Sequence, residues 1–420
     1  MNTPLMTALI IVGIVAFFIV LIWSMKRHRD PTLRVECDDS IEDLMPSLAG
    51  LSLNGAVGGN SVEIFENGAF FDALIEDIDG ASKSVHFESF LWKEGKLGQR
   101  LAAAFVRRAR AGVTVRILLD ATGSKKMGQV VEGQLKDAGC CLEKFHRWHI
   151  QNIGVLNERD HRKLAVIDGR LAFVGGHCVV DTWLGNGSEG QVADVSVRLL
   201  GPIVNSVQAA FSENWVGQTG ELFMGEDVFP EQEEAGNITI HAAFVKPEGS
   251  APAVKLLHHA AICCAKRRIW IQNPYFIPEP EAIDAFGKAV ERGVDVRVLM
   301  PSTSGSDNPI VQHAGHRNFE KLMRCGVRLF EYPSSLLHQK VMTIDGCWCA
   351  IGSANFDDRS FETNDELTLA ILDKATAGQL DKIFEKYAAK SNEIELKRWS
   401  KRSWGHKFVD NAYYLINEIL

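Results

Sequence analysis

The 420-residue sequence lacks an excess of positive charge. Its 45 Lys and Arg residues are outnumbered by 53 Asp and Glu residues, which gives a formal net charge of −8 at pH 7. Proteins that bind nucleic acid generally carry a basic surplus. The charge balance therefore weighs against a nuclease, and we expect no nucleic-acid partner, although a basic cleft is possible on an acidic protein.

The sequence also lacks the cysteine and histidine spacings of zinc sites. Its nine cysteines are an odd number, and Cys140–Cys141 and Cys263–Cys264 are adjacent pairs, so no complete disulfide framework is expected. No group of carboxylates is spaced to hold a metal ion. We therefore predict no metal and no cofactor, and interpret the cysteines as small apolar residues in a reducing compartment.

One long hydrophobic run is present, at the N-terminus. Leu5–Met25 carries no charge and is as long as the roughly 20 residues that a membrane-spanning helix needs. The basic cluster Lys26–Arg29 follows it, which predicts that the rest of the chain lies in the cytoplasm. We predict a transmembrane anchor over residues 1–29; the alternative is a cleaved export signal.

Composition divides the remainder into parts. Residues 30–57 are polar and end in a glycine-rich stretch, typical of a linker, and residues 221–237 form an acidic, loop-like segment. Two domains of similar length are thus expected, at 58–220 and 238–395. A basic and aromatic tail, 396–420, could lie on an anionic bilayer or pack as a helix on the second domain.

The two domains are related by an internal repeat. Gly112–Leu119 resembles Gly293–Met300, and each segment follows an amphipathic helical stretch that is itself preceded by an apolar, strand-like run. Both halves predict the order strand, helix, strand, helix, short strand, motif strand, which indicates an α/β fold with helices covering sheets. A pseudo-twofold axis would place one site between the halves.

Each half carries one copy of a His-x-Lys-x4-Asp motif at the start of a predicted strand. His and Lys, two positions apart, point to the same face of a strand, whereas the Asp, seven positions after the His, faces the other side. The Asp residues are therefore interpreted as structural or orienting members of the catalytic motif. The two motifs are His161/Lys163/Asp168 and His338/Lys340/Asp345.

A glycine-containing turn and then an acidic residue follow each motif. The small turn residues predict phosphate contacts at Gly176, Ser353 and Asn355, because phosphate can approach backbone N–H groups there. Asp194 and Glu366 each open a later strand. A carboxylate bonded to a catalytic His would fix its tautomer, so these two acids are candidate His partners; the alternative is surface acids.

Two His and two Lys residues in one place would form a site for phosphoryl transfer. The ammonium groups would neutralise charge that develops on the phosphate. One imidazole would attack phosphorus to form a phosphohistidine, and the other would protonate the leaving oxygen. This chemistry needs no metal.

These motifs resemble the phospholipase D superfamily and, within it, the bacterial cardiolipin synthases. The resemblance extends over about residues 60–370 and includes Asn157–Lys163, Gln272–Pro278 and Gly352–Glu366. It implies two α/β/α sandwich halves, a phosphatidylglycerol substrate and transfer of its phosphatidyl group to a second lipid with release of glycerol. It also implies His161 as nucleophile and His338 as general acid and base. Together with the single N-terminal hydrophobic run, it predicts a single-pass protein of the bacterial inner membrane.

Two features depart from the family pattern. Cys178 stands where the first-half turn of cardiolipin synthases usually has Asn, and the chain has one N-terminal hydrophobic run where the family has two or none. Other interpretations remain open from sequence: a phospholipase D that uses water as acceptor, a nuclease or phosphodiesterase, or a non-catalytic membrane scaffold. The repeat does not distinguish the roles of the two histidines.

Overall fold

The computed structural model describes residues 6–7, 9–17, 33, 35, 39–52, 54–146, 157–245, 252–333 and 335–414. The chain forms two compact units, Met1–Arg34 and Val35–Leu420. In the first unit, residues 9–17 are helical. Within the described residues no helix is both long and apolar enough to cross a bilayer. Residues 18–25 of the expected span, and the basic cluster Lys26–Arg29, lie outside the described residues.

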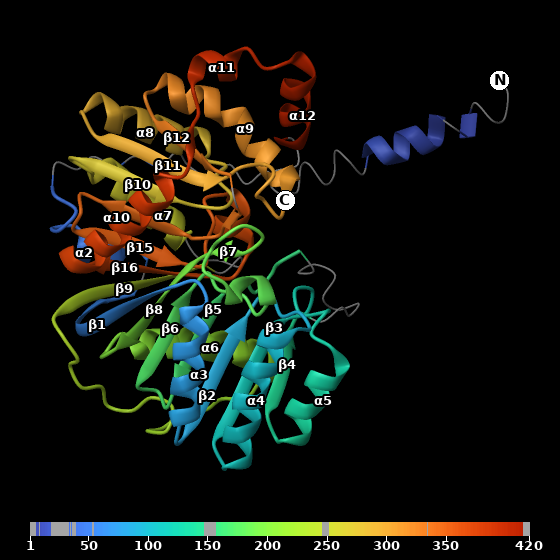
Figure 1. Ribbon diagram of the computed structural model, residues 1–420, viewed down its shortest axis with the longest axis vertical. Helices are drawn as coiled ribbons and strands as arrows, with labels where there is room; N and C mark the ends of the chain where they lie inside the picture. The colour runs from blue at the N-terminus through green and yellow to red at the C-terminus, as the bar shows by residue number, and fades with distance from the viewer. Residues whose placement is uncertain are drawn as a thin grey trace. The chain divides into compact units, whose positions relative to one another are not determined.

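The second unit begins with one short helix and then repeats a mixed α/β arrangement (Figure 1). The helix is α2 (Met45–Leu51). The first half contains β1 (Ala56–Glu66), α3 (Ala69–Gly80), β2 (Ser84–Ser89), α4 (Lys96–Arg110), β3 (Thr114–Asp120), α5 (Gln129–Asp137), β4 (Cys141–Phe145), β5 (Lys163–Ile167), β6 (Leu171–Gly175), η2 (Asp181–Leu184), β7 (Val192–Ala193), β8 (Val195–Leu200) and α6 (Val204–Thr219).

The second half repeats the order of the main strands and helices, has its short strand β13 at a different point from β7, and continues with β17, α11 and α12. It contains β9 (Ile238–Val245), α7 (Ala253–Cys264), β10 (Arg268–Gln272), α8 (Pro280–Glu291), β11 (Asp295–Pro301), α9 (Pro309–Arg324), β12 (Arg328–Tyr332), β13 (Leu336–Leu337), β14 (Val341–Ile344), β15 (Trp348–Gly352), η3 (Arg359–Thr363), β16 (Glu366–Leu372), α10 (Lys374–Ala388), β17 (Asn392–Glu393), α11 (Leu396–Ser400) and α12 (Trp404–Tyr414).

One sheet of 15 strands runs through both halves. Its order is β17-β12-β11-β10-β14-β15-β16-β9-β1-β8-β6-β5-β2-β3-β4. Outward from the junction of β1 and β9, the first half has the order β1-β8-β6-β5-β2-β3-β4. The second half has the equivalent order β9-β16-β15-β14-β10-β11-β12, followed by β17. At the junction β1 and β9 are antiparallel, with Ala56 opposite His241 and Val57 opposite Ile240. The repeat inferred from sequence therefore corresponds to a repeated topology.

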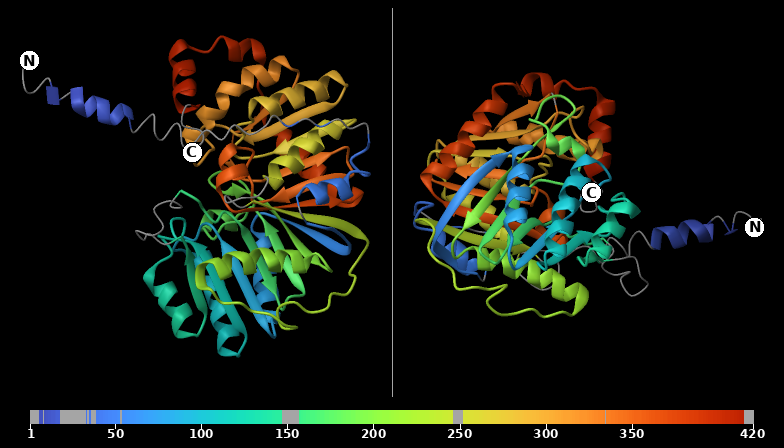
Figure 2. Two further views of the ribbon diagram at one scale, coloured as in Figure 1. Left: turned by 180° about the vertical axis from the view of Figure 1, so that it is seen from behind. Right: turned by 60° about the horizontal axis from the view of Figure 1, so that its bottom comes forward.

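Helices cover both faces of the sheet. In the first half α3, α4 and α5 lie on one face and α6 on the other (Figures 1 and 2). One buried apolar cluster contains residues of both halves. It includes Phe211 of α6 and Val197 of β8 from the first half, and Phe384 of α10 and Leu369 of β16 from the second. Burial of this shared cluster fixes the two halves against each other.

The expected linker and the expected tail both contain helices. Residues 45–51, inside the expected linker over 30–57, form α2, because Met45 and Leu48 join the apolar core beside Leu257 of α7. Strand β1 begins at Ala56, also inside that range. The tail expected at 396–420 contains α11 and α12, and α12 packs against α9; residues 415–420 lie outside the described part of the chain.

Asp168 and Asp345 end the motif strands in matching turns. Both have a positive φ, 53° and 54°. The Asp345 carboxylate accepts the backbone N–H groups of Lys266, Arg267 and Arg268 at 2.7–2.9 Å, and Asp168 accepts those of Ser82, Lys83 and Ser84. Each carboxylate thus anchors the segment that leads into the neighbouring strand, β10 or β2, as a structural group would.

The first prediction concerns this anchor. Asp345→Ala leaves three backbone donors without their acceptor, so we expect the free energy of unfolding to fall by at least about 2 kcal/mol. Folded protein should keep its turnover, because Asp345 follows β14 whereas Lys340 precedes it. Thermal melting and specific activity measure the two effects.

The matched control is Asp284→Ala. Asp284 is 66% exposed and pairs with Lys288 on the surface of α8, so its loss should change stability by well under about 1 kcal/mol. Lost turnover at unchanged stability in Asp345→Ala would contradict the structural role.

Candidate active site

The two motifs meet because the chain ahead of each one pairs with the other half. The backbone N–H of His161 donates to the Asp365 carbonyl at 3.0 Å, and that of His338 donates to the Ala193 carbonyl at 2.8 Å. Strand β13, which ends just before His338, pairs in parallel with β7 of the first half. Each histidine therefore lies beside the residue that precedes the other half's acid.

This crossing creates two reciprocal histidine–carboxylate pairs. His161 Nδ1 lies 2.7 Å from Glu366 Oε1, and His338 Nδ1 lies 2.7 Å from Asp194 Oδ2. Both carboxylates are fully buried, and the imidazoles are nearly so. A carboxylate at Nδ1 holds the proton on that nitrogen and leaves Nε2 as the reactive position.

The motif lysines fold back toward their histidines. Lys340 Nζ lies 2.9 Å from His338 Nε2 and donates to the His338 carbonyl at 2.7 Å. Lys163 Nζ donates to the His161 carbonyl and lies 5.4 Å from the centre of the Phe90 ring. Both side chains are buried, so two cations and two imidazoles share one low-dielectric region.

Burial sets the protonation of these groups. It lowers the pKa of His161 to about 4, although Glu366 acts in the opposite direction. It also lowers the pKa of His338. The same burial, together with nearby Lys163, lowers the pKa of Lys340 to about 8 against the raising effect of Asp194. Near neutral pH the free site thus has neutral imidazoles, of which one could act as nucleophile, and a Lys340 that readily exchanges its proton.

A second layer of contacts orients the carboxylates. Trp183 Nε1 donates to Asp194 Oδ2 at 2.9 Å, and its ring lies edge-on to His338 with centroids 5.3 Å apart. The Ser353 hydroxyl donates to Glu366. Ser353, expected from sequence to contact phosphate, is therefore engaged with the acid of the His161 pair.

The two glycine turns are not equivalent. A Cβ at Gly176 would lie 2.3 Å from Asp194 Oδ1, so glycine makes room for the carboxylate at this position. Cys178 is buried, and burial raises the pKa of its thiol to about 11, so the thiol is neutral. Its repeat equivalent, Asn355, is also buried, and its Oδ1 has no hydrogen-bond partner among the described residues. Only the second turn thus offers an uncommitted amide.

Sequence reasoning missed a buried charged group beneath the first motif. Arg162, between His161 and Lys163, is fully buried and donates to the Ala210 carbonyl at 2.8 Å and to Glu213 at 3.0 Å. Glu88 and Asp160 are buried beside it, and burial raises the pKa of Glu88 to about 7. The sequence does hold one indication of this group. Arg162 lies between His161 and Lys163, on the opposite face of the strand, and a charged residue that is buried there requires partners.

Comparisons with known proteins agree with this geometry. Residues 74–184 and 259–388 match the family described as "Cardiolipin synthase, PLD-like domain". The chain is 31% identical to cardiolipin synthase 2 of Bacillus anthracis over 94% of this chain and 78% of that protein. It is 33% identical to a cardiolipin synthase of Staphylococcus aureus over 86% of this chain and 74% of that one.

A solved structure shares the fold at much lower identity. Phosphatidylserine synthase of Haemophilus influenzae superposes with a TM-score of 0.64 at 14% identity, covering 86% of this chain and 95% of that one. Fold and paired motifs define a phospholipase D-like protein with two halves. On the family match and the curated relatives, the chain belongs to the cardiolipin synthase family of phospholipase D-like enzymes.

The second prediction uses the tight turn. Gly176→Ala forces a methyl group against Asp194, so we expect a loss of about 1–3 kcal/mol in the free energy of unfolding, and lower turnover as Asp194 shifts from His338. Gly133→Ala is the matched control. Position 133 lies within α5 with no atom within 4 Å of an added Cβ, so stability should rise by about 0.5–1 kcal/mol.

Thermal melting and turnover of both variants check this prediction. Wild-type turnover in folded Gly176→Ala would show that the close approach at Asp194 is dispensable.

Proposed function

We propose that this protein is a cardiolipin synthase that transfers a phosphatidyl group from phosphatidylglycerol to a second phospholipid through a phosphohistidine. The observation that carries the proposal is the pair of crossed histidine–carboxylate contacts at 2.7 Å, with a buried lysine beside each histidine. Family membership supports the lipid substrate.

In the first half-reaction His161 Nε2 attacks the phosphorus of phosphatidylglycerol. A P–N bond forms while the P–O bond to the headgroup glycerol breaks, and His338 Nε2 gives its proton to the departing oxygen. Lys163 and Lys340 stabilise the charge on the other phosphate oxygens. The anionic phosphodiester also favours the protonated form of His338 once substrate is bound.

In the second half-reaction the roles reverse. His338 takes the proton from a hydroxyl of the acceptor lipid, whose oxygen attacks phosphorus as the P–N bond to His161 breaks. Two phosphatidyl groups are then joined through one glycerol, and the free glycerol of the first step is the by-product. His161 is assigned as nucleophile from the family resemblance; the crossed contacts are equal in length at the two histidines.

The substrate implies contact with a bilayer. We place the catalytic unit on the cytoplasmic side of the bacterial inner membrane as a single-pass protein, because the charge-free run Leu5–Met25 is followed by Lys26–Arg29. The net charge of −8 supports a partner other than nucleic acid.

The third prediction tests the activity. Purified full-length protein in phosphatidylglycerol vesicles should form cardiolipin and glycerol in equal amounts, and neither His161→Ala nor His338→Ala should form cardiolipin. Phosphatidic acid without cardiolipin would instead assign a hydrolase. Cleaved DNA with unaltered lipid would remove the lipid function altogether.

A trapping experiment tests the roles of the two histidines. With phosphatidylglycerol labelled at phosphorus, His338→Ala should accumulate label on the protein, because water or lipid attack on the intermediate lacks its base. His161→Ala should stay unlabelled. A reversed pattern exchanges the roles, and label on neither variant, with none on wild-type protein quenched during turnover, contradicts the covalent intermediate.

The fourth prediction concerns alkaline pH. Because burial lowers the pKa of Lys340 to about 8, the positive charge is present below that pH and is lost above it. We expect kcat/KM to fall as the pH rises through about 8. Lys340→Arg should move this limb upward, since guanidinium stays protonated.

The control for this pH profile is Lys386→Arg. Its side chain is 46% exposed on α10 and pairs with Glu66, so the limb should stay in place. An unchanged limb in Lys340→Arg would contradict the assignment to Lys340.

A further inference from the structure

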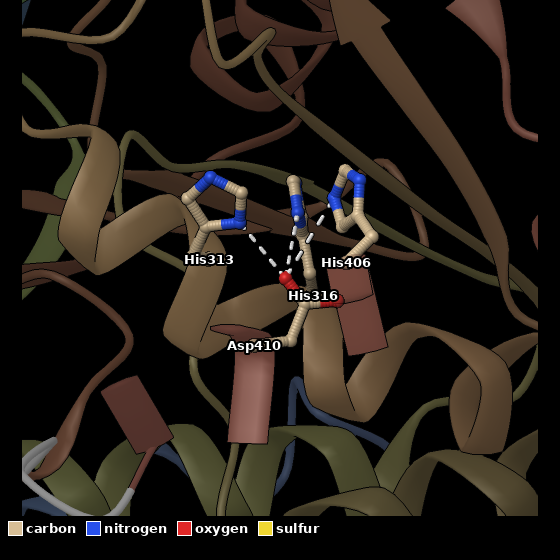
Figure 3. Close-up of side chains that lie close together, drawn as sticks. All are labelled: His313, His316, His406 and Asp410. Carbon is tan, nitrogen blue, oxygen red and sulfur yellow. Dashed lines mark hydrogen bonds and ion pairs between the residues drawn. The ribbon is translucent and has the colours of Figure 1, made fainter. Parts of the chain in front are cut away.

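Three histidines and one aspartate outside the two motifs converge between α9 and α12. His313 and His316 lie one turn apart on α9, and His406 and Asp410 lie one turn apart on α12. Figure 3 shows all three imidazoles directed at the same carboxylate. One ligand atom from each residue can be chosen so that all four lie within 4.8 Å of one another.

The distances centre on a single oxygen. Asp410 Oδ1 lies 2.8 Å from His313 Nδ1, 3.7 Å from His316 Nδ1 and 3.8 Å from His406 Nε2. In a tetrahedral zinc site with bonds of about 2.0–2.1 Å, ligand atoms lie roughly 3.3 Å apart. The four groups therefore need to contract by no more than about 1.5 Å to share one ion.

A second observation points to a missing ligand. His316 is only 2% exposed, and neither of its ring nitrogens has a hydrogen-bond partner among the described residues. A buried polar group without a partner costs about 1–3 kcal/mol.

The surroundings resemble the outer shell of a metal site. Arg402 donates to Asp410 Oδ2 at 2.7 Å, which leaves Oδ1 facing the histidines as a monodentate ligand. Glu331 Oε1 lies 3.8 Å from His316 Nε2, so a metal on Nδ1 would direct the opposite N–H toward a carboxylate. Such second contacts orient metal-bound histidines in known sites.

We infer that His313, His316, His406 and Asp410 form a structural site for a divalent transition metal, zinc in the first instance, that clamps α12 onto α9. Imidazole and carboxylate ligands suit zinc, and four protein ligands fill a tetrahedral shell and leave no position for a substrate. The role is therefore structural and separate from lipid transfer. No local sequence pattern reveals this site, because His313 and Asp410 are 97 residues apart.

The fifth prediction is metal binding by the full-length protein, purified without a histidine tag and stripped with chelator. Zinc should return at about one ion per chain by elemental analysis and should raise the melting midpoint, whereas magnesium should not. Cobalt should give the visible absorption of a tetrahedral ion. Absence of stoichiometric zinc, or cobalt spectra of octahedral type only, would overturn the proposal.

Variants separate this site from adventitious binding. His406 is 41% exposed, so His406→Gln should fold normally yet lose the zinc, the midpoint shift and the cobalt spectrum. His259→Gln removes an imidazole on α7 outside the cluster and should keep all three. Undiminished zinc in folded His406→Gln would overturn the assignment, whatever the outcome of the lipid assay.

Discussion

The candidate site depends on the exchange of carboxylates between the two halves. His161 of the first half is held by Glu366 of the second, and His338 of the second is held by Asp194 of the first. Neither half supplies both the motif histidine and the carboxylate that holds it. Removing one member of a buried pair costs about 3–5 kcal/mol because the other is left unpaired. The same contacts that orient the imidazoles therefore join the halves.

The rest of the fold brings these four residues into register. The β1–β9 pairing makes the sheet continuous, and the His161–Asp365 and His338–Ala193 backbone bonds set each motif against the opposite acid. Gly176 allows the approach of Asp194 from behind. A shift of one residue in either cross-half pairing would turn the carboxylate to the other face of its strand. The register of the halves and the geometry of the site are thus one constraint.

Sequence was a good guide to local order and a poor one to contacts between halves. Alternation along a strand put His and Lys on one face, and the order of strands and helices followed from repeated patterns. The acids Asp194 and Glu366 emerged from the repeat, but no pattern assigned each to a histidine. That assignment depends on the parallel pairing of the two-residue strands β7 and β13, which are too short to leave a periodic signal.

Helix α2 in the expected linker and the cluster of His313, His316, His406 and Asp410 were not predicted for the same reason. Met45 and Leu48 look like isolated apolar residues in a polar segment until α7 supplies a surface for them. His313 and Asp410 are ordinary helix residues until α12 folds onto α9. In each case the information lies in a tertiary contact, which a linear pattern does not record.

The two halves differ in the buried polar residues that lie beneath the motif histidines. Beneath His161 lie the charged residues Arg162 and Glu88, whereas their repeat equivalents beneath His338 are Gln339 and Gln272. The two positions differ together between the halves: both carry ionisable side chains in the first half, and both carry neutral amides in the second. Both layers contain buried polar atoms without hydrogen-bond partners among the described residues, among them Glu88 Oε2 in the first half and Gln272 Oε1 in the second.

This asymmetry bears on a two-step transfer. The two motif lysines also differ, because Lys340 Nζ lies 2.9 Å from His338 Nε2 whereas Lys163 Nζ donates to the His161 carbonyl. A proton carrier must change protonation twice in each cycle, and Lys340 beside His338 Nε2, with a pKa near 8, eases such changes. This contact supports the proposed role of His338 as the proton carrier, which leaves His161 as the proposed attacking group.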